Sequence, residues 1–244
     1  MRKIALIPAR YAATRFPFKL MQPLGTKTVI RHTYDNTVAT GLFDEVIVVT
    51  DSELILKEVT SNGGKAIMSL RQHESGSDRI AEAVANMEAD VILNVQGDEP
   101  FVKKDTLKKL LDVFEGEAGK HVQVASLMKK FADPGLITDP NYVKVVVDKN
   151  MNALYFSRAV IPFLRDEHFK PTWFEHIGVY AFRKQALLNF TAWPPTDMEK
   201  AEKLEQLRYL ENGISIKMVL TEEAGVKIDV PEDLVKAESF LSKV

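Results

Sequence analysis

The chain has 244 residues, of which 45% are hydrophobic, 27% are charged and none is cysteine. This length suits one large domain or a domain with a sizeable insertion, and the lack of thiols excludes disulfide frameworks, thiolate zinc sites and cysteine nucleophiles. A formal net charge of −2 argues against a dedicated nucleic-acid-binding protein, whose surface is usually strongly basic.

The charge is unevenly distributed along the chain. The first 34 residues hold seven Lys and Arg and no acid, so the remaining 210 residues hold 25 bases against 34 acids. No apolar run approaches the roughly 20 residues of a membrane span, and the start of the chain does not have the pattern of a signal peptide. We therefore expect a cytoplasmic protein with no membrane partner.

Short apolar segments alternate with helical patterns in the first half of the chain. Strands are predicted at 3–7, 45–50, 65–68 and 90–95, and helices at 28–40, 52–62 and 77–89. Gly63 and Gly64 are predicted to end the second helix. The runs 46–49 and 91–93 are continuously apolar, which is typical of parallel strands covered on both faces. This series predicts an α/β fold with a parallel sheet and right-handed crossovers.

The second half of the chain is less regular. Strands are predicted at 122–128, 143–148, 153–157, 178–182 and 215–219, a hairpin turn at 149–152, and helices at 197–211 and from 231 to the end. A hairpin inserted into an α/β sheet often covers the site or pairs with another subunit. We expect such a lobe at about residues 130–180 of one domain that spans the whole chain.

The loop after the first predicted strand carries three cations. Arg10, Arg15 and Lys19 lie there beside small residues such as Ala9. Ligands of open α/β sheets bind beyond the carboxyl ends of the strands, and such a loop can bind phosphates through charge-assisted hydrogen bonds. It matches neither the dinucleotide-binding pattern nor the Walker pattern. The alternative is an ordinary solvated basic loop.

Two aspartates follow other predicted strands. Asp98 comes after Gly97 at the end of the strand 90–95, and Asp229 precedes the last helix. Carboxylates are natural Mg²⁺ ligands, and two of them on one sheet edge can hold one hard cation. Each also has a structural alternative, because Asp98 or Asp229 can cap the helix that follows it.

Two further residues have both a structural and a functional interpretation. Ser75 precedes the helix that begins near residue 77, so it is either a helix cap or part of a base-reading loop. His176 precedes a predicted strand, where a single histidine is more often structural than catalytic.

Six segments occur in order along the chain. They are PARYAATR (8–15), VQGDEP (95–100), YFSR (155–158), HIGVY (176–180), LEQLR (204–208) and IDVPED (228–233). Together they resemble the 3-deoxy-manno-octulosonate cytidylyltransferase family, also called CMP-Kdo synthetase, and the resemblance extends from residue 3 to residue 240.

The resemblance implies a reaction of CTP with 3-deoxy-D-manno-octulosonate (Kdo) that gives CMP-Kdo and pyrophosphate for lipopolysaccharide biosynthesis. It also implies a Rossmann-like nucleotide-diphospho-sugar transferase fold, with a mostly parallel mixed sheet flanked by helices, a smaller inserted dimerisation lobe, and a homodimer.

The resemblance assigns roles to individual residues. The CTP-binding residues are Ala9, Arg10, Arg15, Lys19, Ser75 and Arg79, the catalytic residues are Arg10, Arg15, Lys19 and Asp98, and the Mg²⁺ ligands are Asp98 and Asp229. The residues that it assigns to binding of the sugar acid are Gln96, Arg158, His176, Tyr180, Glu205 and Gln206. The planar guanidinium of Arg158 suits the carboxylate of this sugar acid.

The phosphate loop departs from the family pattern at one position. The family has Pro-Gly-Lys-Pro-Leu where this chain has Pro17-Phe18-Lys19-Leu20-Met21. Because a side chain disfavours positive φ, either Phe18 takes a negative φ and points outward, or nucleotide binding is altered.

Other activities remain as alternatives. A related acidic sugar, such as 8-amino-Kdo or a sialic acid, is one. A glycosyltransferase is another, although it would normally carry Asp-x-Asp where this chain has Gln96-Gly97-Asp98. A nucleotide-binding regulator without turnover is the third, and Phe18 alone hints at it.

Overall fold

The computed structural model describes residues 1–12, 16–73, 75–166, 168–222 and 227–241. The chain divides into two compact units. The first comprises residues 1–108 and 225–244, and the second comprises residues 109–224. The lobe expected at about residues 130–180 lies within the second unit.

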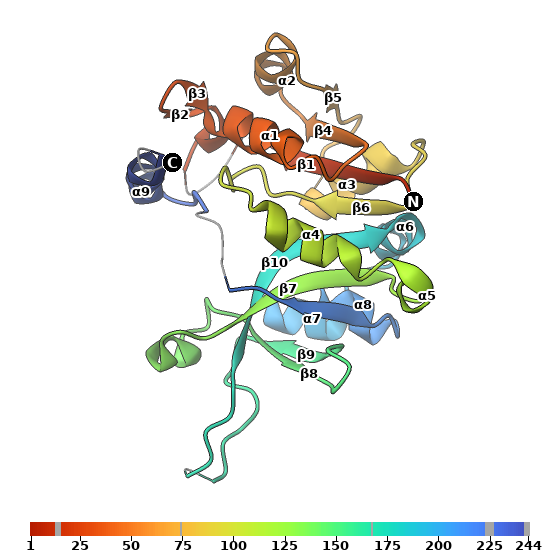
Figure 1. Cartoon of the computed structure of the whole chain (residues 1–244), viewed down its shortest axis with the longest axis vertical. Helices are drawn as coiled ribbons and strands as arrows, with labels where there is room; N and C mark the ends of the chain where they lie inside the picture. Colours follow the sequence, from red (N-terminus) through yellow and green to blue (C-terminus); the bar gives the residue numbers. More distant parts are fainter. Residues whose placement is uncertain (13–15, 74, 167, 223–226, 242–244) are drawn as a thin grey trace. The chain divides into compact units, whose positions relative to one another are not determined.

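The first unit is built on four parallel strands in the order β6-β1-β4-β5 (Figure 1). Their bounds are β1 (Lys3–Ala9), β4 (Glu45–Thr50), β5 (Ala66–Met68) and β6 (Val91–Asn94). Every residue of β6 is buried, as its continuously apolar run predicted. In the register, Ala9 pairs with Thr50 and Leu6 with Asn94, so the carboxyl ends of three strands meet at one edge.

The helices of this unit are α1 (Val29–Ala39), α2 (Glu53–Thr60), α3 (Gly76–Val84), α4 (Lys104–Asp112), which reaches into the second unit, and α9 (Pro231–Leu241). α1 and α2 lie near the predicted bounds and α9 begins at the predicted residue, whereas α3 ends at Val84 and not at the predicted residue 89. A short 3-10 helix, η1 (Lys19–Met21), and the two-stranded pair β2 (Pro23–Leu24) and β3 (Lys27–Thr28) precede α1. The chain turns after α2 because Gly63 adopts φ +79°, which confirms the predicted helix end.

The second unit is built around β7 (Val124–Lys130). β11 (Ile216–Leu220) pairs with it in parallel and β10 (Phe174–Arg183) pairs antiparallel. β8 (Lys144–Val147) pairs with β10 and with β9 (Ala153–Ser157). The predicted hairpin turn between β8 and β9 is confirmed, since Asp148 accepts hydrogen bonds from the backbone of Asn150 and Asn152. The remaining elements are α5 (Gly116–Gly119), η2 (Pro134–Thr138) and α6 (Lys184–Ala192).

The prediction of one helix over 197–211 is wrong. The chain forms α7 (Asp197–Glu202) and α8 (Leu207–Glu211), and Lys203 between them has the left-handed φ of 54°. The Arg158 side chain lies at this break. It donates to the carbonyl oxygens of Glu202 and Lys203 (2.8 and 3.4 Å) and so satisfies carbonyl groups at the end of α7.

The predicted fold class is confirmed. The four strands of the first unit's sheet pair in parallel, β7 of the second unit pairs in parallel with β11 and antiparallel with β10, and helices pack on the strands, as in a mixed α/β sheet. None of the helices in the described ranges is long and apolar enough to span a bilayer.

Candidate active site

The carboxyl edge of the first unit gathers the residues that follow three of its strands. Arg10 is exposed directly after β1, Asp51 follows β4, and Gln96 and Asp98 follow β6. The last of these loops packs closely on β1, because a Cβ added at Gly97 would lie 3.1 Å from the carbonyl oxygen of Pro8. Glycine therefore allows Asp98 to approach the loop after β1.

Lys19, Asp98 and Asp229 form one charged cluster at this edge. The Lys19 ammonium lies 2.5 Å from Asp98 Oδ2 and 3.3 Å from Asp229 Oδ1. Their side chains are 16%, 11% and 27% exposed. The backbone N–H of Ile228 donates to the carbonyl oxygen of Asp98 at 2.9 Å, which fixes the two aspartate segments together. The three residues, distant in sequence, thus converge on one partly buried position.

The second oxygen of Asp98 explains what this cluster can bind. Asp98 Oδ1 is buried and has no hydrogen-bond partner among the residues that the structure describes. Asp98 does not cap α4, which begins only at Lys104. An unpaired buried carboxylate oxygen is costly and suits a hard cation.

The donor set also fits Mg²⁺. Within the described ranges no three His, Cys, Asp or Glu side chains converge as a metal cage. Mg²⁺ is commonly held by one or two carboxylates together with substrate phosphates, which Asp98 and Asp229 match.

Phe18 introduces η1 with an unusual backbone. It has φ 58° and ψ 23°, so the hypothesis of a negative φ is wrong. The expected outward orientation is observed, since the residue is 46% exposed. Its ring lies against the Tyr11 ring, with centroids 4.4 Å apart, and this contact offsets part of the cost of the left-handed conformation. Arg15, predicted to bind phosphate, lies outside the described residues.

Arg79 supports the loop after β1 from within. It is buried, and its guanidinium donates to Asp51 Oδ2 at 2.8 Å and to Ser69 Oγ at 2.9 Å. The other oxygen of Asp51 accepts from the backbone N–H of Tyr11 at 3.1 Å. Arg79 therefore fixes the chain one residue beyond Arg10, and its predicted contact with CTP stays a prediction.

Ser75 and Ala9 occupy well-defined places in the first unit. The Ser75 hydroxyl accepts a hydrogen bond from the backbone N–H of Asp78, so its predicted cap role at α3 is confirmed. Ala9 is the buried last residue of β1. Neither observation tests their predicted contacts with the nucleotide.

A second polar cluster lies on β7 and β10 in the second unit. The Ser126 hydroxyl lies 2.9 Å from the carbonyl oxygen of Val179, to which it donates, and 3.0 Å from His176 Nε2. His176 Nε2 is therefore the donor to Ser126, which leaves Nδ1 to accept from Gln206 Nε2 at 3.4 Å. Burial lowers the pKa of His176 to about 3, so the ring is neutral at physiological pH.

An irregularity in β10 creates this arrangement. The register with β7 shifts between Ile177 and Tyr180, so that Tyr180 lies opposite Ser126. The His176 and Tyr180 rings then lie with centroids 5.4 Å apart. Burial, with the nearby charge of Glu205, raises the pKa of Tyr180, so its hydroxyl stays protonated. The cluster therefore offers neutral hydrogen-bonding groups.

The Arg158 guanidinium contacts backbone in this structure. Besides Glu202 and Lys203, it donates to the carbonyl oxygen of Pro140 at 2.8 Å. The turn around Pro140 is held further by Lys144, whose ammonium donates to the carbonyl oxygens of Asp139 and Tyr142. The binding of a sugar carboxylate by Arg158 stays a prediction.

The structure adds residues that the sequence analysis missed. Asp51 follows a strand at the same edge as Asp98, so the rule applied to Asp98 would have found it. Ser126 lies in the middle of an apolar strand, and Glu202, which accepts from Ser157 Oγ at 2.6 Å, lies in a helix. No sequence signal distinguishes these two residues from ordinary positions.

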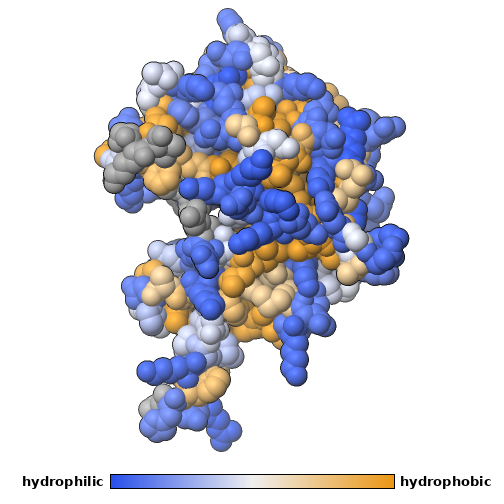
Figure 2. Space-filling model, viewed as in Figure 1, coloured by the Kyte–Doolittle hydropathy of each residue, from blue (hydrophilic) through white to orange (hydrophobic). Residues whose placement is uncertain are grey.

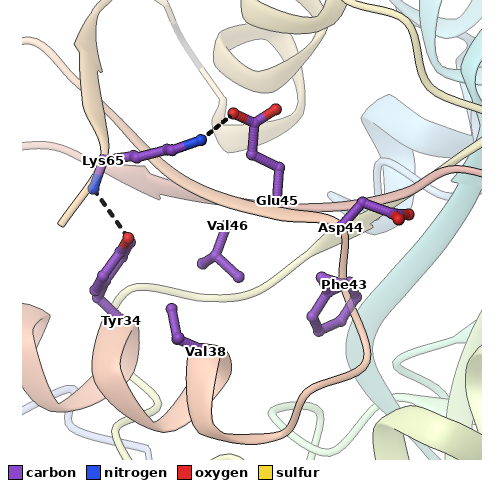
Figure 3. A pocket seen from close by; sticks show the side chains of 7 residues that line it. All are labelled: Tyr34, Val38, Phe43, Asp44, Glu45, Val46 and Lys65. Atoms are coloured by element: carbon purple, nitrogen blue, oxygen red, sulfur yellow. Dashed lines mark hydrogen bonds and ion pairs between the residues drawn. The ribbon is translucent and has the colours of Figure 1, made fainter.

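A small cavity of about 180 Å³ lies elsewhere in the first unit (Figure 3). Its lining residues are Tyr34, Val38, Phe43, Asp44, Glu45, Val46 and Lys65. Glu45 and Val46 begin β4, so the cavity is at the amino end of a strand whose carboxyl end carries the candidate site. It is smaller than the roughly 300 Å³ at which ligand pockets begin.

Comparison with known proteins identifies the family. The model of a cytidylyltransferase family matches residues 4–218. A 3-deoxy-manno-octulosonate cytidylyltransferase of Flavobacterium johnsoniae is 57% identical over 244 residues, which cover all of both chains. This chain belongs to the 3-deoxy-manno-octulosonate cytidylyltransferase family.

Solved structures agree with this cytidylyltransferase assignment. A structure of CMP:2-keto-3-deoxy-manno-octonic acid synthetase complexed with CTP is 35% identical, with a TM-score of 0.94, and covers 100% of this cytidylyltransferase and 99% of that chain. A cytidylyltransferase from Leptospira borgpetersenii has a TM-score of 0.67 at 16% identity, covers 100% of this chain and 88% of its own, and shares the fold. A Phocaeicola vulgatus relative with the same name as the Flavobacterium protein is 45% identical over 253 residues, 100% of this chain and 98% of its own.

Proposed function

We propose that this cytidylyltransferase joins CMP from CTP to Kdo and releases pyrophosphate, as a step in lipopolysaccharide biosynthesis. The observation that carries the proposal is the convergence of Lys19, Asp98 and Asp229 at the carboxyl edge of a parallel sheet. The names of the full-length relatives support the choice of CTP and Kdo.

The reaction requires positioning and charge neutralisation. A sugar hydroxyl oxygen attacks the α-phosphorus of CTP, the new P–O bond forms, and the bond from the α-phosphorus to the bridging oxygen breaks with that electron pair leaving on pyrophosphate. The hydroxyl proton is lost to solvent. Lys19, with Arg10 and Arg15, would stabilise the charge that accumulates on pyrophosphate. No covalent nucleophile of the protein is required.

Asp98 and Asp229 would hold Mg²⁺, which when bound neutralises phosphate charge and lowers the pKa of a coordinated hydroxyl. The unpartnered buried Asp98 Oδ1 supports this assignment. The carboxylates also orient Lys19, which keeps its ammonium at the edge where the triphosphate would lie.

The sugar acid would bind to the polar cluster of the second unit. His176, Tyr180 and Gln206 present neutral donors and acceptors whose positions are fixed by Ser126 and by burial. The family resemblance also assigns Gln96, Glu205 and Arg158 to the sugar acid. A site whose buried polar groups require a partner discriminates strongly against analogues that lack a hydroxyl, which favours one sugar acid over others.

We also propose a homodimer formed through the segment between β9 and β10. Figure 1 shows this segment extending beyond the strands of its own unit, and Figure 2 shows an orange, hydrophobic patch near its far end among mostly blue atoms. The exposed apolar residues in and beside it are Leu154, Val160, Phe163 and Phe169, and Phe163 is 86% exposed. Exposed apolar side chains such as these would suit a protein interface, and a second copy of the chain would offer the same residues.

Sedimentation analysis tests the dimer. A dimer is expected for the wild-type chain and a weakened dimer for Phe163→Ser. Val235→Ser, a change at an exposed apolar residue of α9, serves as the matched control. A wild-type monomer at micromolar concentration would contradict the assignment.

The consumption of CTP, a cytoplasmic nucleotide, supports a cytoplasmic location.

The activity is tested by pyrophosphate release from CTP and Mg²⁺ with Kdo, 8-amino-Kdo and sialic acid in parallel. Kdo is expected to give the highest kcat/KM. Asp197→Asn, at a fully exposed aspartate, is the matched control for Asp98→Asn. Release with none of the three acids would overturn the proposal. Binding of CTP without release would favour the regulator, and transfer of the sugar from a CMP-sugar to an acceptor, with release of CMP, would favour the glycosyltransferase.

A further inference from the structure

The Lys19 ammonium occupies the position between two carboxylates. It donates to Asp98 Oδ2 and Asp229 Oδ1 in a partly buried environment. One ammonium thus contacts two carboxylates at once, and a divalent cation held by Asp98 and Asp229 would contact the same two groups. The other oxygen of Asp98, Oδ1, is buried and has no hydrogen-bond partner among the described residues.

We propose that Lys19 is an exchangeable counter-ion: its ammonium neutralises Asp98 and Asp229 while the nucleotide is absent, competes there with a divalent cation, and moves to phosphate oxygens when the nucleotide binds. This inference rests on the metal assignment of the proposed function and deepens it.

The chemistry of lysine suits such an exchange. The lysine ammonium is a compact charge on a flexible stem of four carbons, and it can change partners without moving its backbone. The backbone at Lys19 is held in η1, where Met21 N donates to Phe18 O at 2.9 Å and Gln22 N donates to Lys19 O at 3.2 Å. The side chain alone therefore has to rotate.

The exchange predicts how cation and nucleotide binding depend on each other. Without a phosphate, a divalent cation must displace the ammonium from both carboxylates and leave it without an anion. With a phosphate present, Lys19 has a new anionic partner and the carboxylates are released. Because linkage is reciprocal, each ligand then strengthens the binding of the other.

The test measures the affinity of Mn²⁺ alone for the nucleotide-free protein, by the electron paramagnetic resonance signal of free Mn²⁺. Lys19→Met removes the competing charge and is expected to tighten Mn²⁺ binding by about tenfold or more. Tenfold corresponds to the low end of the free energy of one hydrogen bond to a charged group. Lys19→Arg keeps a cation and is expected to stay near wild type. Lys27→Met, which removes a lysine from an exposed pair with Asp35, is the matched control and is expected to change nothing.

Two further measurements keep the outcome decisive. The double change Lys19→Met with Asp98→Asn is expected to lose the gain, which locates the Mn²⁺ at the carboxylates. Circular dichroism checks that each variant folds, and Lys19→Gln replaces Lys19→Met if that variant does not. Mn²⁺ affinity of Lys19→Met equal to that of wild type, or no Mn²⁺ binding by either variant, would overturn the inference. Pyrophosphate release is not used here, so failure of the proposed function would be seen separately.

Discussion

Phe18 has a left-handed backbone in the loop between β1 and α1, and its replacement has opposing energetic effects. Its ring contact with Tyr11 is worth about 1 kcal/mol beyond burial. About half of the side chain is buried, which contributes roughly another 1 kcal/mol. The left-handed backbone at φ 58° opposes these terms and costs about 1–2 kcal/mol for any residue except glycine.

These terms predict an order for two variants. Phe18→Ala loses the ring but keeps the backbone cost, so the free energy of unfolding falls by about 2 kcal/mol. Phe18→Gly loses the ring and also the backbone cost. The greater entropy of the unfolded chain with glycine lowers the stability by about 0.4–1 kcal/mol, which offsets part of the relieved backbone cost. The glycine variant is therefore expected to be more stable than the alanine variant by about 0.5–1 kcal/mol.

Urea unfolding of the three proteins measures this order, and initial rates against CTP concentration measure the effect on function. The KM for CTP is expected to change only modestly in Phe18→Gly, because the ring points outward. An alanine variant as stable as the glycine variant would refute the left-handed assignment. A large fall in KM for the glycine variant would show that Phe18 obstructs the nucleotide.

Three further predictions concern charge. Asp98→Asn is expected to lower kcat about 100-fold or more in the pyrophosphate assay, with a near-normal thermal unfolding curve; a near wild-type rate would remove Asp98 from the site. Burial lowers the pKa of His176 to about 3, so between pH 6.5 and 3 only the unfolded chain gains a proton there. The free energy of unfolding therefore decreases as the pH is lowered from 6.5 to 3. His176→Gln should flatten the slope of unfolding free energy against pH in this window. Burial would raise the pKa of Glu199, but hydrogen bonds from Arg208 and from the Thr196 backbone outweigh it and lower the pKa below 4.5. This stability is present above pH 4.5 and lost below it, so Glu199→Gln should cost about 3 kcal/mol at pH 7 and remove the acid dependence; an unchanged urea midpoint would contradict the paired geometry.

Much of the first unit follows from local sequence patterns. The strands β1, β4, β5 and β6 are apolar runs between helical patterns, and β4 has the bounds that the sequence predicts. The meeting of Asp98 with the loop after β1 follows as well, because parallel strands present their carboxyl ends at one edge. That Lys19 bridges both Asp98 and Asp229 does not follow, since it depends on where a segment 210 residues away returns to the sheet.

The second unit shows where sequence patterns are insufficient. The pattern over 197–211 is helical throughout, but the structure breaks it at Lys203, where the side chain of the distant Arg158 binds the carbonyl oxygens of Glu202 and Lys203. Similarly, the contact between His176 and Ser126 requires the register shift in β10, which a sequence with Gly178 permits but does not specify. Tertiary hydrogen bonds determine both features.

The most direct test of the central claim is the ³¹P spectrum of CTP incubated with Mg²⁺, Kdo and the purified protein. The account predicts that the three CTP signals disappear while a phosphodiester signal of a CMP-sugar and a pyrophosphate signal appear in equal molar amounts. Asp98→Asn and Lys19→Met should leave CTP intact over the same time. An unchanged CTP spectrum, or inorganic phosphate with CDP in place of pyrophosphate, would contradict nucleotidyl transfer.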